Sequence, residues 1–333
     1  MKTIFLCDSA YQIQRVYAES VQARLQELTD IEEACYTKAD VLAAPAKFAE
    51  VEFAFSTWGM PSFSEAEIRA YLPKLKCVFY GAGSVQAFAR PFLNCGVKVF
   101  SAWAANAVPV AEYTVSQILL ANKGFFTHTR LMAEKRVNES YGIIPNYIGN
   151  FHAKIGLIGC GMIGSLVAEM LKAYDVEVLA FDPFLSEDKA RELQVTLCSL
   201  DELFASCNVV SNHLANNAET RGMLTYQLFA SMPPYATFLN TGRGAQVVED
   251  DLVRALTDRT DLTAVLDVTD PEPAALTHPF YTLPNCFLTP HIAGSLGNEV
   301  VRMAEYMVNE YLHFTSGTPC RYEVSLKMLE TMA

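Results

Sequence analysis

The chain alternates short apolar runs with longer amphipathic segments. Runs at 3–7, 51–56 and 77–80 contain few polar residues, as strands buried on both faces do. Between such runs, apolar residues recur every three to four positions. This spacing predicts helices over 12–28, 64–71 and 85–94, with two further strands at 31–36 and 97–100. The strand–helix alternation predicts a parallel sheet covered by helices on both faces.

A second series of strands begins at residue 154. An apolar helical pattern over 107–122 precedes it, with an extension toward residue 135 left open, and 137–153 is expected to be a connecting loop. The expected strands of this series are 155–158, 177–181, 195–198, 207–212, 237–240, 263–267 and 286–288. A last helix is expected at 298–314, and 317–329 has no clear period.

Too little chain follows residue 294 to build another domain, so we expect the last helix to return to the first one. The sequence therefore predicts an α/β fold with two doubly wound parallel-sheet domains and a cleft between them. The expected first domain is discontinuous, comprising residues 1–103 and 296–333, and the second comprises residues 104–295.

Composition narrows the classes of function. The chain is 51% hydrophobic with a net charge of -12, which disfavours binding to nucleic acid or to anionic membranes. Its nine cysteines form no CxxC pair and no metal-ligand spacing, which suits reduced thiols in a cytoplasmic protein. No apolar run approaches the length of a membrane span, and the start of the chain is typical of a strand rather than a signal peptide.

A glycine-rich loop follows the strand at 155–158 and precedes a helical pattern. Gly159 suits a tight turn, Gly161 lets the backbone approach a pyrophosphate, and Gly164 allows the helix to pack closely on the strand. The helix N-terminus offers unpaired N–H groups to phosphates. An ordinary strand–helix turn is the alternative, and Asp182 at the end of the next strand argues against it.

Asp182 also selects the nucleotide. A carboxylate at this position can accept both hydrogen bonds of a ribose diol and would repel a 2′-phosphate. Residues 183–185 supply no cation for such a phosphate, so we expect NAD rather than NADP. A helix N-cap or an ordinary surface aspartate is the alternative interpretation of this residue.

Three later turns each carry a candidate for chemistry. Arg243, Glu272 and His291 follow three different strands of the second series, so we expect them at one edge of the sheet. An arginine suits bidentate capture of a carboxylate, a histidine suits proton transfer, and a nearby glutamate stabilises the imidazolium. Each alone could be a structural or solvated residue. Together, beside a nicotinamide, they predict hydride exchange between a 2-hydroxy acid and a 2-oxo acid.

These motifs, together with 106–114, resemble the D-isomer-specific 2-hydroxyacid dehydrogenase family over nearly the whole chain. The resemblance implies a Rossmann-type NAD domain inserted in a flavodoxin-like substrate domain, and a homodimer. It places Arg243, Glu272 and His291 at the catalytic positions. The implied substrate-binding residues are Ala82, Gly83, Arg243 and His291. The implied cofactor-binding residues are Thr114, Gly159, Gly161, Met162, Ile163, Gly164, Asp182, His213, Thr241, Asp267 and Gly294.

The chain departs from the family at several positions. Met162 stands where the family usually has arginine, so one cation near the pyrophosphate is missing. Ala215 replaces a common proline, and Val85-Gln86 replaces a polar pair that often follows the family's substrate loop, which corresponds to 81–84 here.

The predicted activity is NAD-dependent interconversion of a D-2-hydroxy acid and its 2-oxo acid, with Arg243 as anchor and His291, supported by Glu272, as acid and base. Two alternatives stay open: a non-catalytic NAD-sensing regulator, and a dehydrogenase of another small anion such as formate or phosphite. The expected partner is a small acid, with no nucleic acid, no membrane and no metal.

Overall fold

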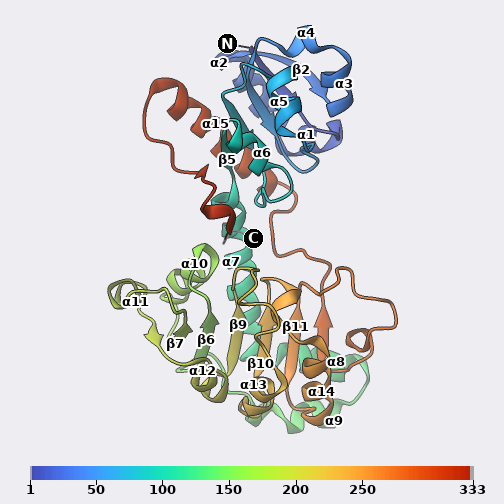
Figure 1. The fold of residues 1–333 in the computed structure, drawn as a ribbon. Helices are drawn as coiled ribbons and strands as arrows, with labels where there is room; N and C mark the ends of the chain where they lie inside the picture. The colour runs from blue at the N-terminus through green and yellow to red at the C-terminus, as the bar shows by residue number, and fades with distance from the viewer. Residues whose placement is uncertain (1, 331–333) are drawn as a thin grey trace. The chain divides into compact units, whose positions relative to one another are not determined.

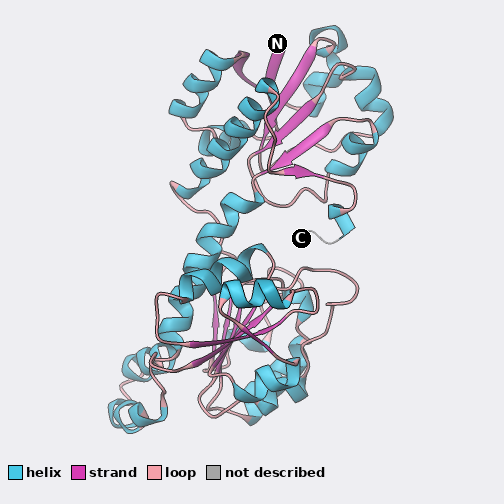
Figure 2. Cartoon of the chain, turned by 90° about the vertical axis from the view of Figure 1, so that its left-hand side faces the viewer, coloured by secondary structure: helices cyan, strands magenta, loops and turns pink. Residues whose placement is uncertain are grey.

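A computed structural model of the chain describes residues 2–330 and divides the chain into two compact units. The first unit comprises Met1–Asn106 and Ser295–Ala333, and the second comprises Ala107–Gly294. In each unit a sheet lies between layers of helices (Figures 1 and 2). The expected α/β class, with two mainly parallel sheets, is confirmed.

The sheet of the first unit has six strands in the order β13-β5-β4-β3-β1-β2. Five of them pair in parallel: β1 (Lys2–Leu6), β2 (Asp30–Tyr36), β3 (Val51–Ser56), β4 (Cys77–Tyr80) and β5 (Lys98–Ser101). The sixth, β13 (Glu323–Val324), joins β5 in the antiparallel direction at the edge. The sequence gives no periodic signal for this short strand.

Helices bury apolar side chains on both faces of this sheet. One face is covered by α1 (Ala10–Val16), α2 (Glu19–Leu28) and α15 (Glu299–Ser316). The other face is covered by α3 (Lys38–Ala43), α4 (Pro45–Phe48), α5 (Glu65–Tyr71) and α6 (Ala89–Asn94). The long helix α15 therefore packs beside the first two helices of the chain, which makes this unit discontinuous in sequence.

The sheet of the second unit has seven parallel strands in the order β12-β11-β10-β9-β6-β7-β8. They are β6 (Lys154–Ile158), β7 (Glu177–Phe181), β8 (Thr196–Leu197), β9 (Val209–Asn212), β10 (Thr237–Asn240), β11 (Thr263–Leu266) and β12 (Cys286–Leu288). The strand order reverses between β6 and β9. In open α/β sheets, ligands bind at the carboxyl ends of the strands beside such a reversal.

Two further layers of helices enclose this sheet (Figure 1). One core contains side chains of α7 (Trp103–Ala121), α8 (Phe125–Ala133), α10 (Met162–Leu171) and α11 (Glu187–Leu193). The opposite core contains side chains of α12 (Leu200–Ser206), α13 (Tyr226–Ser231) and α14 (Glu249–Asp258). Helix α9 (Val137–Gly142) follows α8 in the chain.

The single helix expected over 12–28 is wrong, because the chain bends between α1 and α2. The break is at Tyr17, whose buried hydroxyl donates to the carbonyl of Ser56 at 3.0 Å and of Phe79 at 3.2 Å. The two acceptor residues are far from Tyr17 in the sequence, so the local helical period could not reveal the break.

Other boundaries also differ from the expected ones. The expected loop over 137–153 contains α9 and a 3₁₀ turn at Ile144–Asn146. Helix α7 ends at Ala121, and α8 begins separately after Gly124, whose φ of 66° is left-handed. Helices α3 and α4 were not expected, and α6 is shorter than the 85–94 pattern indicated.

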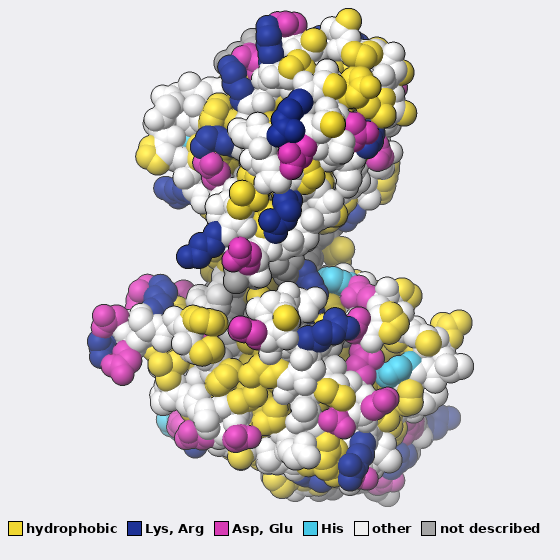
Figure 3. All heavy atoms as spheres, in the orientation of Figure 1, with side chains coloured by type: hydrophobic (Ala, Val, Ile, Leu, Met, Phe, Trp, Pro, Cys, Tyr) yellow, Lys and Arg dark blue, Asp and Glu magenta, His cyan; other side chains and the backbone are white. Residues whose placement is uncertain are grey.

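Within residues 2–330, no helix is both long and apolar enough to cross a membrane. Acidic and basic side chains are interspersed on the face of each unit that Figure 3 shows.

Candidate functional site

The glycine loop connects β6 to α10. Gly159 has a φ of 87°, and Gly161 stands at the N-cap of α10. A Cβ atom on Gly164 would lie 2.0 Å from the carbonyl oxygen of Gly159, so the tight packing expected at this position is present. Ile163 is partly buried against the core, and Met162 is 48% exposed at the start of the helix.

Asp182 lies directly after β7 and braces this loop. Its Oδ2 accepts the N–H of Cys160 at 2.7 Å, and its Oδ1 accepts the N–H of Phe184 at 2.9 Å. Each carboxylate oxygen can accept a second hydrogen bond, so the side chain remains able to bind a ribose diol. The bracing contact was not expected from the sequence, because it depends on how the strand ends fall side by side.

His213 lies beneath the glycine loop, because a Cβ atom on Gly159 would be 3.1 Å from the His213 backbone. Burial lowers the pKa of His213 to about 4, so the ring is neutral at pH 7. Its Nε2 lies 2.9 Å from the Ser211 hydroxyl, while its buried Nδ1 has no partner among the described residues. Such an unpaired nitrogen suits a site that a bound nucleotide completes.

Arg243 follows β10 in a turn held by Gln246. The buried Gln246 Oε1 accepts the Arg243 N–H at 3.1 Å, and the guanidinium Nη1 donates to the carbonyl of Gly242 at 2.8 Å. Within residues 2–330, no carboxylate forms an ion pair with Arg243. Burial lowers the pKa of this guanidinium, and the charge of Glu272 opposes that shift. A partly buried cation without an ion pair is suited to bind an anion.

Helix α7 contacts two of the turns at this edge of the sheet. The buried Thr114 hydroxyl lies 3.1 Å from that of Thr241, which begins the Arg243 turn. The Tyr113 hydroxyl lies 3.2 Å from that of Thr289, which precedes His291. These hydrogen bonds connect the first helix of the unit to turns that lie far along the chain.

Asp267, which is 2% exposed, holds the turn that carries His291. Its Oδ1 accepts the Thr289 hydroxyl at 2.6 Å and the Ile292 N–H at 2.8 Å, and its Oδ2 accepts the Ala293 N–H at 2.9 Å. Gly294, the last residue of the unit, follows directly. This bracing role was missed, because the sequence suggested only a cofactor contact for Asp267.

His291 and Glu272 form a close pair. The His291 Nδ1 lies 2.6 Å from the Glu272 Oε1, and the two side chains are 45% and 41% exposed. The His291 backbone has a left-handed φ of 54°, and its N–H donates to the carbonyl of Asp267. With Nδ1 paired, Nε2 is the ring nitrogen available to exchange a proton.

Ala82 and Gly83 lie in the first unit, in the loop after β4. The Ser101 hydroxyl lies 2.9 Å from the Ala82 carbonyl and 2.6 Å from that of Gly83, and the Ala102 N–H also donates to Ala82. The N–H groups of Gly83 and Ser84 have no hydrogen-bond partner among the described residues. The loop is therefore fixed through its carbonyls while these two donors remain free for an anion.

All nine cysteines are free thiols. Within residues 2–330, no group of three or more histidine, cysteine or acidic residues is arranged to hold a metal ion.

Residues 115–293 match the sequence model of the D-isomer specific 2-hydroxyacid dehydrogenase, NAD binding domain. The chain belongs to this family. The match covers more than half of the chain and contains the glycine loop, Asp182 and the three turns, so the nucleotide for this loop is NAD.

Relatives agree with this assignment. A D-3-phosphoglycerate dehydrogenase of Archaeoglobus fulgidus is 30% identical over 237 residues, which are 71% of this chain and 44% of that protein. A Staphylococcus haemolyticus protein named as a 2-hydroxyacid dehydrogenase is 32% identical over 249 residues, covering 74% of this chain and 77% of that protein. The chain thus spans less than half the length of the phosphoglycerate dehydrogenase.

The fold is shared with solved structures. That of apo D-mandelate dehydrogenase from Rhodotorula graminis has a TM-score of 0.81 at 16% identity, covering 97% of each chain. At this identity the likeness concerns the fold alone.

Two glycine variants separate folding from nucleotide binding. Gly164→Ala should lower the free energy of unfolding by about 1–3 kcal/mol, because its Cβ would overlap the Gly159 carbonyl. Gly161→Ala meets nothing within 4 Å and should keep its stability. Both variants should bind NADH more weakly. At position 161 the reason is that a Cβ atom would occupy the space through which the backbone approaches the pyrophosphate. Denaturant unfolding and fluorescence titration measure the two effects, and unchanged stability in Gly164→Ala would contradict the close contact.

Proposed function

We propose that this protein is an NAD-dependent dehydrogenase that interconverts a D-2-hydroxy acid and its 2-oxo acid. The observation that carries the proposal is the 2.6 Å pair of His291 and Glu272, in the same unit as an arginine without an ion pair and an NAD loop. Membership of the family supports it.

Arg243 binds the substrate's carboxylate and polarises its C2 oxygen. A guanidinium presents a planar fork that matches a carboxylate, and partial burial strengthens its attraction to an anion. The free N–H groups of Gly83 and Ser84 support a substrate-binding role for Gly83. Ala82, whose N–H donates to the Tyr80 carbonyl at 2.9 Å, is included on the family resemblance.

His291 moves the proton. In the reductive direction its Nε2 donates a proton to the C2 oxygen, and in oxidation it accepts one. Glu272 holds the ring through Nδ1 and stabilises the imidazolium form. When bound, NADH supplies the hydride for C2.

The NAD site would comprise the residues expected from the sequence. Gly159, Gly161 and Gly164 accommodate the pyrophosphate, Asp182 takes the ribose diol, and the neutral His213 offers its unpaired Nδ1. Thr114, Thr241, Met162, Ile163, Asp267 and Gly294 complete the proposed set. Because Met162 supplies no cation, we expect only modest affinity for the pyrophosphate.

The substrate is proposed to be unphosphorylated. Residues 56–62 and 80–84, which we take to be the specificity loops, contain no lysine or arginine of their own. Met60, Phe63 and Tyr80 are buried in the core beneath these loops, which leaves the partly exposed Trp58 as the apolar side chain proposed to contact the substrate. The first unit would then bind the substrate and the second NAD. Nine free thiols support a cytoplasmic location.

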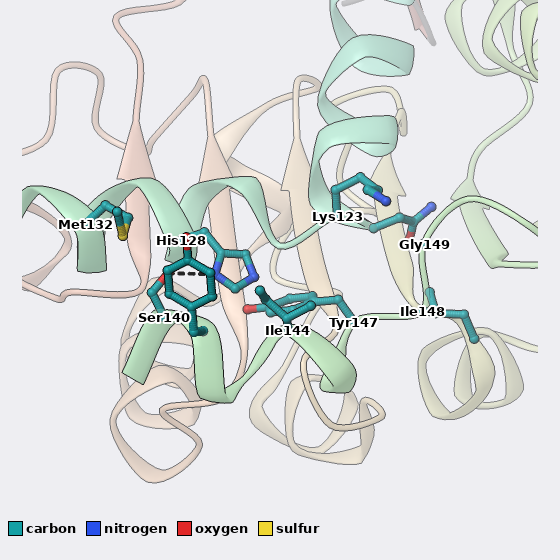
Figure 4. A pocket seen from close by; sticks show the side chains of 10 residues that line it. Lys123, His128, Met132, Ser140, Ile144, Tyr147, Ile148 and Gly149 are labelled. Carbon is teal, nitrogen blue, oxygen red and sulfur yellow. Dashed lines mark hydrogen bonds between the residues drawn. The ribbon is translucent and has the colours of Figure 1, made fainter. Parts of the chain in front are cut away.

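We further propose a homodimer that uses the segment 120–151. Eight of the seventeen exposed large hydrophobic side chains among the described residues lie in it: Leu120, Phe125, Met132, Val137, Tyr141, Ile144, Ile148 and Phe151. Four of them, Met132, Tyr141, Ile144 and Ile148, line an open groove of about 510 Å³, seen in Figure 4 beside the His128–Ser140 hydrogen bond. Such an apolar concentration is typical of a surface that a partner covers, and the family resemblance indicates a second copy.

The activity is tested with a panel of glyoxylate, hydroxypyruvate, pyruvate and bulkier 2-oxo acids, following NADH consumption. His291→Ala should reduce kcat by about 10²–10⁴-fold while NADH still binds. His152→Ala is the matched control, because His152 is also exposed, lies in the same unit and has a left-handed φ of 55°. Binding of NADH without turnover of any acid would favour a regulator. Oxidation of formate or phosphite alone would favour another dehydrogenase.

Asp182→Ala should weaken the binding of NADH about tenfold, equivalent to about 1.4 kcal/mol, and should affect the binding of NADPH less. The reason is that the carboxylate favours a ribose diol and repels a 2′-phosphate. Asp188→Ala, which removes a surface carboxylate of the same unit, is the control. Fluorescence titration of both nucleotides gives the ratio, and an unchanged ratio would refute the specificity argument.

Ile144→Glu should convert a dimer of twice 36.8 kDa into monomers, because it places a charge beside the groove. Leu197→Glu, on the edge strand β8, changes an exposed apolar residue outside the segment and should leave the dimer intact. Sedimentation velocity measures both. A wild-type monomer, or a dimer unaffected by Ile144→Glu, would show that this segment is not the interface.

A further inference from the structure

Glu249 is the first residue of α14, the helix that follows the Arg243 turn. Its carboxylate is only 13% exposed. The Oε1 atom accepts the N–H of Asp270 at 2.8 Å, and Oε2 lies 3.3 Å from His278 Nε2. One side chain therefore contacts both ends of the segment 270–278, which contains Glu272.

The hydrogen bonds of His278 define its role in this contact. Its Nδ1 accepts the N–H of Phe280 at 3.3 Å, so Nε2 carries the proton that is donated to Glu249. Phe280 is 1% exposed in the core of the unit. The imidazole is thus anchored to the core, and both oxygens of Glu249 act as acceptors, as an ionised carboxylate does.

Burial raises the pKa of the Glu249 carboxyl, and its contacts with the Asp270 N–H and with His278 act in the opposite direction. The carboxylate is therefore partly desolvated and depends on these two partners. Removing the Glu249 carboxylate would leave the Asp270 N–H without this acceptor.

The segment around Glu272 has few other restraints, and the Thr269 hydroxyl, which donates to the Pro271 carbonyl at 2.9 Å, is an exposed one. Residues 270–273 and 275–277 are exposed, and only Ala274 among 270–277 is buried. Arg221 pairs with Asp270 at 2.9 Å, but this is an exposed ion pair and such pairs contribute little. The Tyr281 hydroxyl donates to the Ala274 carbonyl at 3.2 Å on the far side of Glu272. On the N-terminal side of Glu272, at Asp270, the partly buried contact is the one made by Glu249.

The Arg243 turn and the Glu272 segment meet at Asp270, where Glu249 binds. A Cβ atom on Gly244, the residue after Arg243, would lie 2.1 Å from the carbonyl carbon of Thr269 and 2.5 Å from the nitrogen of Asp270. The Arg243 turn and the Glu272 segment therefore touch backbone to backbone at the N–H group that Glu249 binds.

We propose that Glu249 is a positioning residue that fixes the Glu272 segment against the Arg243 turn and thereby orients the ring of His291. This inference rests on the proposed dehydrogenase function. Glu249 touches neither substrate nor cofactor in this role, and its effect on turnover passes through Glu272.

The alternative is that Glu249 merely stabilises the N-terminus of α14, as an acidic first-turn residue does. Asp250 provides the matched control, since it occupies the next position of the same turn, is exposed and carries the same charge. Replacing either acid removes one favourable charge at the helix end, but only Glu249 holds the Asp270 N–H.

Steady-state kinetics with the acid that the wild type reduces best form the first test. Glu249→Ala should lower kcat at least tenfold without changing the dissociation constant of NADH. Glu249→Gln, whose amide oxygen can still accept from Asp270, should recover most of the loss. Asp250→Ala should stay within twofold of the wild type. Wild-type kcat in Glu249→Ala, or equal losses in Glu249→Ala and Asp250→Ala, would overturn the proposal.

A double-mutant cycle separates positioning from general damage. If Glu249 acts through Glu272, Glu249→Ala should cause no further loss of kcat in a Glu272→Gln background. Multiplication of the two losses would mean that Glu249 acts independently of Glu272, which overturns the proposal.

Hydrogen exchange at the Asp270 amide, measured by NMR without substrate, tests the positioning role of Glu249 separately from the proposed dehydrogenase function. Exchange should accelerate in Glu249→Ala and stay at the wild-type rate in Asp250→Ala. If the wild type reduces no acid, the proposed function fails, and faster exchange in Glu249→Ala alone would still support the fixing of this segment. Unchanged exchange would refute it whatever the activity.

Discussion

The buried carboxylate of Asp267 is the contact on which the position of His291 depends. It stands at the end of β11 and binds one hydroxyl and two N–H groups from the turn after β12. An ionised group in such a place is stable only when hydrogen bonds replace its lost water. The turn is therefore restricted to a conformation that supplies those donors, and in that conformation His291 is presented to Glu272.

Charge at the carboxyl edge of this sheet is arranged by burial as well as by pairing. Arg243 is partly desolvated without an ion pair, and His213 is neutral because its surroundings disfavour the imidazolium. His291, by contrast, is exposed and paired with a carboxylate. His213 and His291, which follow β9 and β12 at the same edge of the sheet, are thus suited to different tasks, the first to contact a neutral group and the second to transfer a proton.

Most of the strands could be predicted because buried parallel strands are nearly continuous apolar runs, and the family could be predicted because its motifs lie in short stretches. Contacts between distant segments left no such signal. The bend at Tyr17 depends on carbonyls of β3 and β4, and the bracing roles of Asp182 and Asp267 depend on the alignment of neighbouring strand ends. The edge strand β13 is too short to show a period.

The hydrogen bonds from α7 to the Arg243 and His291 turns bear on the order of folding. Thr114 and Tyr113 bind partners 127 and 176 residues later in the chain. Contacts of such sequence separation form slowly, because long loops must close before they contribute. During synthesis the glycine loop and Asp182 emerge well before Thr289. A nascent chain would thus hold the elements of a nucleotide site before the turn that carries His291 has been synthesised.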